Sequence, residues 1–304
     1  MARVVFLGTP EEAVPTLTAL HQTQEIGLVV TQPDRPKGRS RRPVPPPVKN
    51  AALELGLTVA QPESRAELAE GIAEHGPFDV GVVVAYGRIL RPEVLEQPAH
   101  GFVNVHFSLL PRWRGAAPVA RALMAGDPMT GVSIIVLEEG LDTGPVLTAQ
   151  AIDILPDDNA GTLTDRLATV GARLLAEVLP DYLTGELRPV PQTDAGATYA
   201  EKIEPEDRVI DPSADVDTVV AQVRGLAPVP GATLVIDGTP HKILAVRPAS
   251  HEMAAGSWVA VGDRPIVGLG DGAIEVVTIQ PPGRNPMSGE DWLRGLHRKG
   301  GNVS

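Results

Sequence analysis

The feature that most constrains the fold is a regular alternation of short β-branched runs with longer helical stretches across the first two thirds of the chain. Runs of this kind are typical of parallel strands that are buried on both faces by helices. They lie at Val4–Leu7, Gly27–Val30, Val80–Ala85, Phe102–His106, Val132–Leu137 and Val146–Ile152. The clearest helix follows Gly161, because apolar residues from Leu163 to Val178 recur every three or four positions. The sequence therefore predicts the α/β class, with a mostly parallel sheet.

A second, smaller domain is expected after a change of pattern between residues 191 and 207. Pro191, Gly196 and Pro205 predict a linker there, which separates a first domain over 1–190 from a second over 208–304. In the second domain, short alternating runs have the regular spacing of a small barrel or sandwich, and we expect an OB-like barrel. A helical stretch and these runs lie at Val216–Arg224, Ala232–Ile236, His241–Val246, Ser257–Val261, Pro265–Leu269 and Ala273–Ile279.

The composition excludes several classes of protein. Hydrophobic residues make up 43% and charged residues 21% of the 304 residues, as in ordinary globular proteins. No apolar run approaches the roughly 20 residues of a membrane span, and the run Val4–Leu7 is too short for a signal peptide. The chain has no Cys, which excludes disulfides, thiolate catalysis and cysteine metal sites. We therefore expect a monomeric cytoplasmic protein with no membrane partner.

A group of polar side chains marks the end of the predicted strand Phe102–His106. Because successive side chains alternate between the two faces of a strand, Asn104, His106 and Ser108 should project from one face. Pro111 prevents the strand from continuing, so this polar face should end at the sheet edge where ligands of open α/β sheets bind. Each residue taken alone also has a structural explanation, such as a hydrogen-bonded histidine of the core.

Asp142 joins this group from a second segment, Leu141–Gly144. An Asp before Thr-Gly is an ordinary turn residue when it is taken alone. Together with Asn104 and His106, however, it completes a set of a hydrogen-bond donor, an acid/base group and an orienting carboxylate. This set is the one needed to add an amine to a carbonyl carbon. We therefore interpret the three residues as catalytic.

Two segments near the N-terminus bear on the binding of anions. Gly8–Glu12 lacks the glycine fingerprint of dinucleotide sites and the lysine of a P-loop, and Thr9 and Glu12 are expected instead to cap a helix that begins at Pro10. Gln32–Lys49, by contrast, concentrates Pro, Gly and basic residues in a chain whose net charge is -12. We expect a basic, Pro/Gly-rich loop that binds a polyphosphate backbone, with a solvated loop as the alternative.

Several motifs resemble those of the methionyl-tRNA formyltransferase family, within the wider folate-dependent formyltransferases. They are Gly8–Pro10, Thr31–Arg39, Val84–Gly87, Asn104–Pro118 and Gly140–Gly144, and the resemblance spans nearly the whole chain. It implies a Rossmann-like sheet domain followed by an OB-like domain. It also implies transfer of a formyl group from the co-substrate 10-formyltetrahydrofolate to the α-amino group of initiator methionyl-tRNA, without a metal.

The resemblance also implies roles for individual residues. Asn104 and His106 would stabilise the charge that develops on the formyl oxygen, while Asp142 would orient His106. Folate would contact the segment made by Ser108, Leu109, Leu110 and Pro111, beside a wall formed by Val84–Leu90. The residues that would contact tRNA are Arg35, Lys37, Arg39, Arg41 and Arg42. One departure is Asp211-Pro212, which stands where the family commonly has Asp-Trp.

Two alternatives remain open at this point. The first is a formyltransferase whose acceptor is a small amine, such as an amino sugar, and it predicts activity that is insensitive to moderate salt. The second is a non-catalytic RNA-binding protein that uses the sheet edge and the basic loop as a binding surface. It predicts no formyl transfer.

Overall fold

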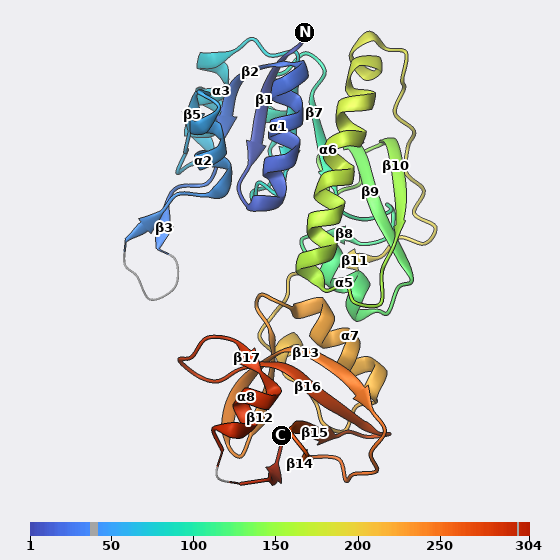
Figure 1. The fold of residues 1–304 in the computed structure, drawn as a ribbon. Helices are drawn as coiled ribbons and strands as arrows, with labels where there is room; N and C mark the ends of the chain where they lie inside the picture. Colours follow the sequence, from blue (N-terminus) through green and yellow to red (C-terminus); the bar gives the residue numbers. More distant parts are fainter. Residues whose placement is uncertain (37–41, 297) are drawn as a thin grey trace. The chain divides into compact units, whose positions relative to one another are not determined.

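The computed structural model describes residues 1–36, 42–296 and 298–304 and divides into two compact units (Figure 1). Unit 1 contains residues 1–115, 130–152 and 164–199, and unit 2 contains residues 116–129, 153–163 and 200–304. None of the helices in the described ranges combines the length and the apolar character that a membrane span requires.

A mostly parallel sheet forms the centre of unit 1, as the alternating runs predict. Its strands follow the order β10-β9-β7-β6-β1-β2-β5. Parallel pairing joins β1 to β2 and to β6, β2 to β5, and β6 to β7, whereas β9 is antiparallel to β7. The strands are β1 Arg3–Gly8, β2 Glu25–Val30, β5 Val59–Ala60, β6 Val80–Val84, β7 Phe102–His106, β9 Met129–Val136 and β10 Val146–Asp153. The fold class predicted from the sequence is confirmed.

Helices cover both faces of this sheet. They are α1 Val14–Thr23, α2 Pro47–Glu54, α3 Arg65–His75, α4 Pro92–Leu95 and, from residue 164 onward, α6 Ala160–Thr184. On one face, Val5 of β1 and Phe102 of β7 belong to a buried cluster that also contains Leu68 and Ile72 of α3. On the other face, α1 and α6 lie side by side (Figure 1). The sheet is therefore buried on both sides, which explains why its strands are continuous apolar runs.

The packing of α6 against β7 decides which way the polar residues of β7 face. Gly171 of α6 lies so close to Val105 of β7 that an added Cβ would collide with the valine side chain. Because side chains alternate along a strand, Val105 faces α6 while Asn104 and His106 face the opposite side with Phe102. The alternation predicted for Phe102–His106 thus places both polar groups on one face.

The segment Gln32–Lys49 is more ordered than the sequence predicts. Within its described part, β3 Arg35–Pro36 pairs antiparallel with β4 Pro43–Val44, and α2 begins at Pro47. The prediction of a loop over the whole segment is therefore wrong at the residues that form β3, β4 and the start of α2. Proline is tolerated in the first turn of a helix because that position needs no hydrogen-bond donor, so the prolines there do not exclude α2.

The helix cap predicted at Thr9 is also wrong. A 3-10 helix over Glu11–Ala13 follows Pro10 with no side-chain cap, and α1 begins only at Val14. The hydroxyl of Thr9 instead donates to the carbonyl oxygen of Tyr86, at 3.0 Å. Thr9 therefore holds a distant loop rather than the helix that follows it.

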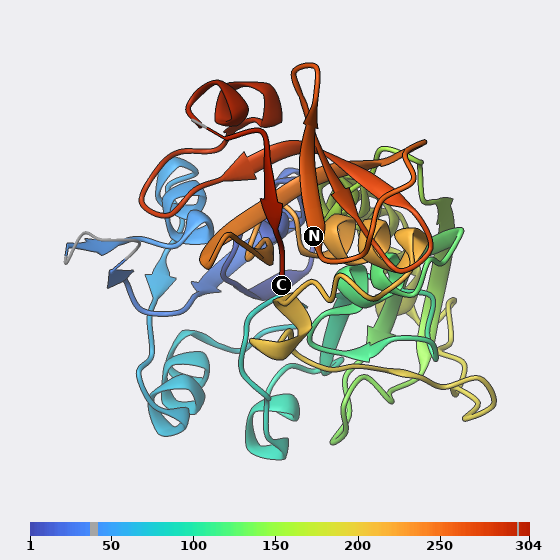
Figure 2. The same cartoon turned by 90° about the horizontal axis from the view of Figure 1, so that it is seen from below.

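Unit 2 contains an antiparallel sheet that curls on itself. Its strands follow the order β12-β13-β16-β15-β14-β18, with β17 paired to β16. Val303, next to β18, also bridges to Ile236 of β12, so the two ends of the sheet approach each other. Figure 2 shows this curled sheet from below, and helix α7, Val216–Leu226, packs against β13. The strands are β12 Ala232–Ile236, β13 Thr239–Ala249, β14 Ser257–Val261, β15 Arg264–Gly268, β16 Ala273–Gln280, β17 Met287–Ser288 and β18 Gly300–Asn302.

The core of unit 2 joins this sheet to its helices. Val219 and Val223 of α7 are buried in one cluster with Trp258 of β14 and Trp292 of α8. The remaining short elements of the chain are α5 Pro118–Met124, α7 Val216–Leu226, α8 Gly289–Arg294, β8 Arg114–Gly115, β11 Tyr199–Ala200 and a 3-10 helix at Glu206–Arg208.

Candidate active site

Two of the residues predicted to be catalytic lie on β7, in the middle of the unit 1 sheet. Asn104 pairs in register with Ile135 of β9, and His106 pairs with Ser133. Both side chains are buried, with 9% of Asn104 and 5% of His106 exposed. His106 is the last residue of the strand, so the polar face ends where β7 ends, at the carboxyl edge of the sheet.

The ring of His106 is held by a backbone carbonyl. Its Nε2 lies 2.9 Å from the carbonyl oxygen of Trp113. A carbonyl oxygen can only accept a hydrogen bond, so Nε2 carries the proton in this arrangement. The other ring nitrogen, Nδ1, faces Asp142 at 3.6 Å from Oδ2. Nδ1 is therefore the nitrogen that remains for proton exchange.

Asp142 reaches this position from a tight turn after β9. Its φ is +53°, a left-handed conformation that non-glycine residues adopt at a cost. The turn lies close against β9, since a Cβ at Gly144 would collide with the carbonyl oxygen of Val136. The carboxylate is 14% exposed, and its Oδ2 accepts the backbone N–H of Gly115 at 2.8 Å. The same oxygen therefore faces Nδ1 of His106 and holds the chain after Trp113.

The side chain of Asn104 has no hydrogen-bond partner among the residues that the structure describes. A primary amide offers two donors and an acceptor. The amide atoms of Asn104 are not among the fully buried side-chain atoms without a partner, so they are open to solvent. Such a group is accordingly suited to a ligand that brings its own acceptor. Asn104 and His106 thus present a donor and a titratable ring on one face of β7.

The segment after β7 is fixed by hydrogen bonds at both ends. The hydroxyl of Ser108 donates to the carbonyl oxygen of Arg112 at 2.6 Å. The hydroxyl of Ser133 donates to the carbonyl oxygen of Ser108 at 2.8 Å and accepts the N–H of Leu110 at 3.1 Å. Leu109, Leu110 and Pro111 are partly exposed. Sequence reasoning missed Ser133, because a single hydroxyl inside an apolar strand gives no signal of its own.

The loop over Val84–Leu90 is hydrogen-bonded to residues that follow β1 and β2. The carbonyl oxygen of Tyr86 accepts the hydroxyl of Thr9 at 3.0 Å and the side-chain amide of Gln32 at 3.3 Å. The ring of Tyr86 is buried, and this burial raises the pKa of its hydroxyl. Ile89 on the same loop is 76% exposed. A rigid backbone therefore presents an apolar side chain to solvent.

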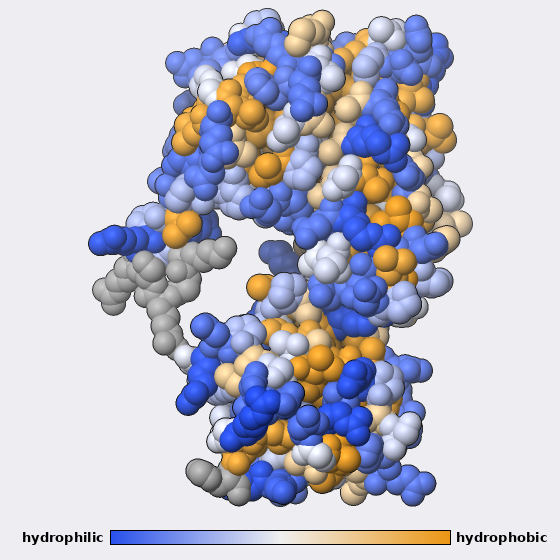
Figure 3. All heavy atoms as spheres, in the orientation of Figure 1, coloured by the Kyte–Doolittle hydropathy of each residue, from blue (hydrophilic) through white to orange (hydrophobic). Residues whose placement is uncertain are grey.

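Two basic residues of the predicted tRNA-binding group are described: Arg35 lies on β3, and Arg42 directly precedes β4. Arg35 and Arg42 are exposed. The face of the protein in Figure 3 carries hydrophilic and hydrophobic residues interspersed. Lys37, Arg39 and Arg41 lie outside the described residues. The side chain of Lys49 is held nearby, because its Nζ donates to both carboxylate oxygens of Asp34, at 2.8 and 2.9 Å.

Asp34 and Lys49 form a polar cluster with Gln61 at the base of the pair. Gln61 accepts from Lys49 at 2.6 Å and donates to Asp34 at 2.7 Å. These bonds, first from Lys49 and then from Gln61, lower the pKa of the Asp34 carboxyl. Gln61 also donates to the carbonyl oxygen of Gln32 at 2.8 Å. The base of the basic segment is thus fixed to the end of β2.

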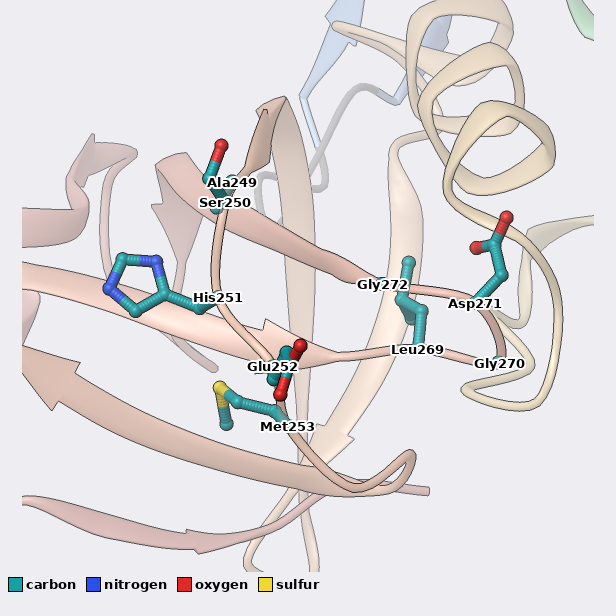
Figure 4. Close-up of a pocket in the computed structure, with 9 residues that line it drawn as sticks. All are labelled: Ala249, Ser250, His251, Glu252, Met253, Leu269, Gly270, Asp271 and Gly272. Atoms are coloured by element: carbon teal, nitrogen blue, oxygen red, sulfur yellow. The ribbon is translucent and has the colours of Figure 1, made fainter.

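Two open hollows in the surface lie away from the residues predicted to be catalytic. One, of about 610 Å³, lies in unit 2 between the β13–β14 connection and the β15–β16 turn (Figure 4). The other, of about 620 Å³, lies between α1 and α6 of unit 1. We place the candidate site at the end of β7, because an imidazole and a carboxylate face each other there at 3.6 Å. The unit 2 hollow is lined by His251, Glu252 and Asp271, but the described residues show no ion pair between that imidazole and a carboxylate. Within the described ranges, no three His, Asp or Glu side chains are grouped as metal ligands.

Comparison with known proteins identifies the family. The formyl transferase family model matches residues 2–179, and the model of the formyl transferase C-terminal domain matches residues 202–297. This chain belongs to the formyl transferase family. The first match contains β7, the turn of Asp142 and the basic segment, so all of the residues predicted from the sequence for the site lie in this part of the formyl transferase.

Relatives of this formyl transferase match it along nearly its whole length. A protein of Halorhodospira halophila named methionyl-tRNA formyltransferase is 50% identical over 299 residues, which are 97% of this chain and 96% of the relative. A protein of Jannaschia sp. with the same name is 45% identical over 304 residues, 99% of each chain.

Solved structures with lower identity share the fold of this formyl transferase. HypX from Aquifex aeolicus in complex with tetrahydrofolic acid has a TM-score of 0.68 at 17% identity, and the match covers 96% of this chain but 47% of HypX. The chain thus spans about half the length of the HypX structures it matches. The sugar 3N-formyl transferase WlaRD has a TM-score of 0.65 at 16% identity, covering 94% of this chain and 99% of WlaRD.

Proposed function

We propose that this formyl transferase moves the formyl group of 10-formyltetrahydrofolate to the α-amino group of initiator methionyl-tRNA. The observation that carries the proposal is the identity of 50% and 45% with relatives named methionyl-tRNA formyltransferase, over nearly the full length of both chains. The structure that binds tetrahydrofolic acid supports a folate donor for this fold. Because the proposed reaction belongs to translation initiation, we also propose that the enzyme acts in the cytoplasm.

The proposed chemistry begins with attack of the amine on the formyl carbon. An α-amino group has a pKa of about 7.7–8.0, so a useful fraction of it is neutral near pH 7 without further activation. A bond forms between the amine nitrogen and the formyl carbon, and the bond from that carbon to the folate nitrogen breaks. The amine loses one proton and the folate nitrogen gains one, so the protein must exchange protons without a net gain.

We propose that Asn104 and His106 stabilise the negative charge that develops on the formyl oxygen. The amide of Asn104, which has no partner in the described part of the chain, supports a role as a donor to that oxygen. His106 can donate only from Nδ1, since its Nε2 proton is used by the carbonyl of Trp113. An imidazolium formed this way would face the Asp142 carboxylate, with Oδ2 at 3.6 Å. Asp142 would then stabilise the charged ring, while Trp113 orients it.

We also propose the binding surfaces for the two substrates. The segment Ser108, Leu109, Leu110 and Pro111 would contact folate, with Val84–Leu90 as the opposite wall. The bonds from Ser133 and from Thr9 support this, because they hold the two segments rigidly before a ligand arrives. For tRNA, we propose Arg35, Lys37, Arg39, Arg41 and Arg42, of which Arg35 and Arg42 are exposed in the described residues.

An acceptor assay tests the proposal. Purified protein with labelled 10-formyltetrahydrofolate should formylate initiator methionyl-tRNA and should leave a sugar-nucleotide amine unmodified. Because phosphate contacts release counterions, log kcat/KM for tRNA should fall with log salt by about 0.7–0.9 per phosphate neutralised. Formylation of the amino sugar without any transfer to tRNA would replace this acceptor with a small amine. No transfer to either acceptor would end the proposal.

Matched arginine variants test the tRNA surface separately. Arg35→Gln and Arg42→Gln should raise KM for tRNA, leave KM for the formyl donor unchanged, and each reduce the salt slope by about 1. Arg65→Gln is the control, because Arg65 is an exposed arginine at the start of α3. Equal effects of all three variants would show that the β3–β4 pair is not the phosphate-binding surface.

A further inference from the structure

The position of Asp142 depends on a side chain that lies 50 residues further along the chain. The side-chain amide of Gln192 donates to the carbonyl oxygen of Asp142 at 2.8 Å and to that of Gly144 at 2.7 Å. Both carbonyls belong to the turn in which Asp142 has its left-handed φ of +53°. A strained residue of this kind persists only where its surroundings determine it. Gln192 stabilises this conformation from outside the turn, through its two hydrogen bonds to the turn's carbonyl oxygens.

The orientation of the Gln192 amide is itself fixed by Arg114. The oxygen of the amide, Oε1, accepts from Nε of Arg114 at 3.1 Å and from Nη2 at 2.9 Å. A flipped amide would turn its NH₂ group toward the guanidinium and its oxygen toward two carbonyl oxygens, so every contact would become repulsive. Gln192 therefore has one orientation, in which its donors point at the Asp142 turn.

Arg114 is buried, which makes its pairing a strong constraint. Its side chain is 4% exposed, and its Nη1 lies 3.2 Å from the carboxylate of Asp194, a side chain that is 94% exposed. A buried guanidinium must keep its partners, because leaving it unpaired carries a large desolvation cost. Asp194 is almost fully exposed to water, so Gln192 is the more buried of these two partners of the guanidinium. We therefore expect the contact between Arg114 and Gln192 to persist.

The residues on either side of Arg114 hold the other groups of the site. The carbonyl oxygen of Trp113 holds the His106 ring, and the N–H of Gly115 holds Oδ2 of Asp142. Thr198 fixes this short segment, accepting the N–H of Trp113 on its hydroxyl at 2.9 Å and the N–H of Arg114 on its carbonyl at 2.9 Å. Three consecutive residues, 113 to 115, therefore fix the positions of the His106 ring, the Asp142 turn and the Asp142 carboxylate.

We propose that Gln192 and Arg114 are positioning residues, which fix the distance between Asp142 Oδ2 and His106 Nδ1. The inference rests on the proposed function, because it assigns the reaction to that pair. Neither side chain needs to touch substrate. Their effect is to hold the Asp142 turn from its backbone side while Gly115 holds it from its carboxylate side.

Gln192→Glu tests the inference with the smallest change. A glutamate keeps an oxygen for Arg114 but places the other oxygen against the carbonyls of Asp142 and Gly144, which removes both donated bonds. Misplacement of a reacting group by about 1 Å can cost on the order of 10²-fold in rate, so we expect kcat to fall by about 10–100-fold. KM for the formyl donor should stay near that of the wild type, and circular dichroism should show a folded protein.

Gln150→Glu is the matched control. Gln150 of β10 is partly buried like Gln192, and its Oε1 also accepts from an arginine, Nη2 of Arg173, at 2.6 Å. The chemical change is the same, but Gln150 has no contact with the Asp142 turn among the described residues. Its kcat should stay at the wild-type value. A loss of kcat equal to that of Gln192→Glu would overturn the inference.

A double-mutant cycle separates positioning from a general structural effect. In an Asp142→Ala background, Gln192→Glu should cause no further loss, since there is no carboxylate left to position. An undiminished loss in that background, a wild-type kcat for Gln192→Glu, or a loss confined to KM would contradict the proposal. If Gln192→Glu does not fold, Gln192→Asn takes its place, because asparagine keeps both amide functions on a shorter side chain. The kcat of Gln192→Asn should fall below the wild-type value, and this loss should also vanish in the Asp142→Ala background.

The same measurements distinguish this inference from the proposed function. A wild-type protein that transfers no formyl group to methionyl-tRNA refutes the proposed function. A wild-type protein that transfers it normally, with Gln192→Glu equally active, refutes the positioning role alone.

Discussion

Replacing Ser133 by alanine tests how the proposed folate segment is held in place. The side chain is fully buried, and its hydroxyl binds the carbonyl oxygen of Ser108 and the N–H of Leu110. Alanine leaves both backbone groups without that partner, and each unsatisfied buried group costs about 1–3 kcal/mol. Because Leu110 is partly exposed, water can compensate part of its loss. We therefore expect a local destabilisation of about 2–3 kcal/mol.

Hydrogen exchange measures this destabilisation where it occurs. If the amide of Leu110 exchanges by local opening, a loss of about 2 kcal/mol makes its exchange roughly 30-fold faster, since 1.4 kcal/mol corresponds to a factor of ten. KM for 10-formyltetrahydrofolate should rise because the segment must be ordered when the donor binds, whereas KM for methionyl-tRNA should not change.

Thr130→Val on the same strand is the control for Ser133→Ala. The hydroxyl of Thr130 is buried and has no partner in the described part of the chain. Removing such a hydroxyl should not destabilise the protein and can stabilise it. Unchanged exchange at Leu110 in Ser133→Ala, or the same acceleration in Thr130→Val, would refute the reasoning.

Two further predictions concern charged groups and pH. Burial, with further contributions from Asp165 and Glu11, raises the pKa of Glu12, so the folded state favours the neutral acid and its stability falls as pH rises through that raised pKa; Glu12→Gln should raise Tm at pH 8, and a gain that persists below pH 4 would contradict this. Hydrogen bonds from Arg121, at 2.9 and 2.7 Å, lower the pKa of Asp207. The ion pair therefore stabilises unit 2 at pH values above the pKa of Asp in the unfolded chain, and this stabilisation is lost as the pH falls through the pKa of Asp207 in the folded protein. Asp207→Asn should therefore lower Tm at pH 7 and leave it unchanged near pH 2, where an equal difference would refute the assignment.

Hydrophobic pattern predicted the elements that are strongly periodic. The strand over Phe102–His106 and the strands over Ala232–Ile236 and Ser257–Val261 have the bounds that the alternation indicates. These segments bury one or both faces, so local pattern and tertiary packing agree on them. The domain boundaries at 190 and 208 stay a prediction, which limited proteolysis can test.

Local signals failed where a residue is used by a distant part of the chain. Thr9 has the sequence context of a helix cap, yet its hydroxyl binds the carbonyl of Tyr86, 77 residues away. Arg114 and Gln192 are 78 residues apart, and Gln192 lies in the segment predicted as a linker from its composition. Neither periodicity nor turn chemistry carries information on such pairs.

The candidate site was predictable as a set of residue types but not as a geometry. Asn104, His106 and Asp142 were identified by the chemistry that they could perform together. The structure adds that Trp113, through its carbonyl oxygen, orients the His106 ring, and that Asp142 faces Nδ1 at 3.6 Å. A backbone carbonyl is the same in every residue, so no sequence pattern could have indicated it.

The most direct test of the account is the single-turnover rate of formyl transfer to initiator methionyl-tRNA in three variants. Asn104→Ala, His106→Ala and Asp142→Ala should each lose at least about 10²–10³ in rate, as expected when a group that stabilises the transition-state charge is removed. Their circular dichroism spectra and their affinity for 10-formyltetrahydrofolate should stay those of the wild type. A folded variant with a rate near that of the wild type would contradict the assignment of that residue, and three such variants would contradict the active site itself.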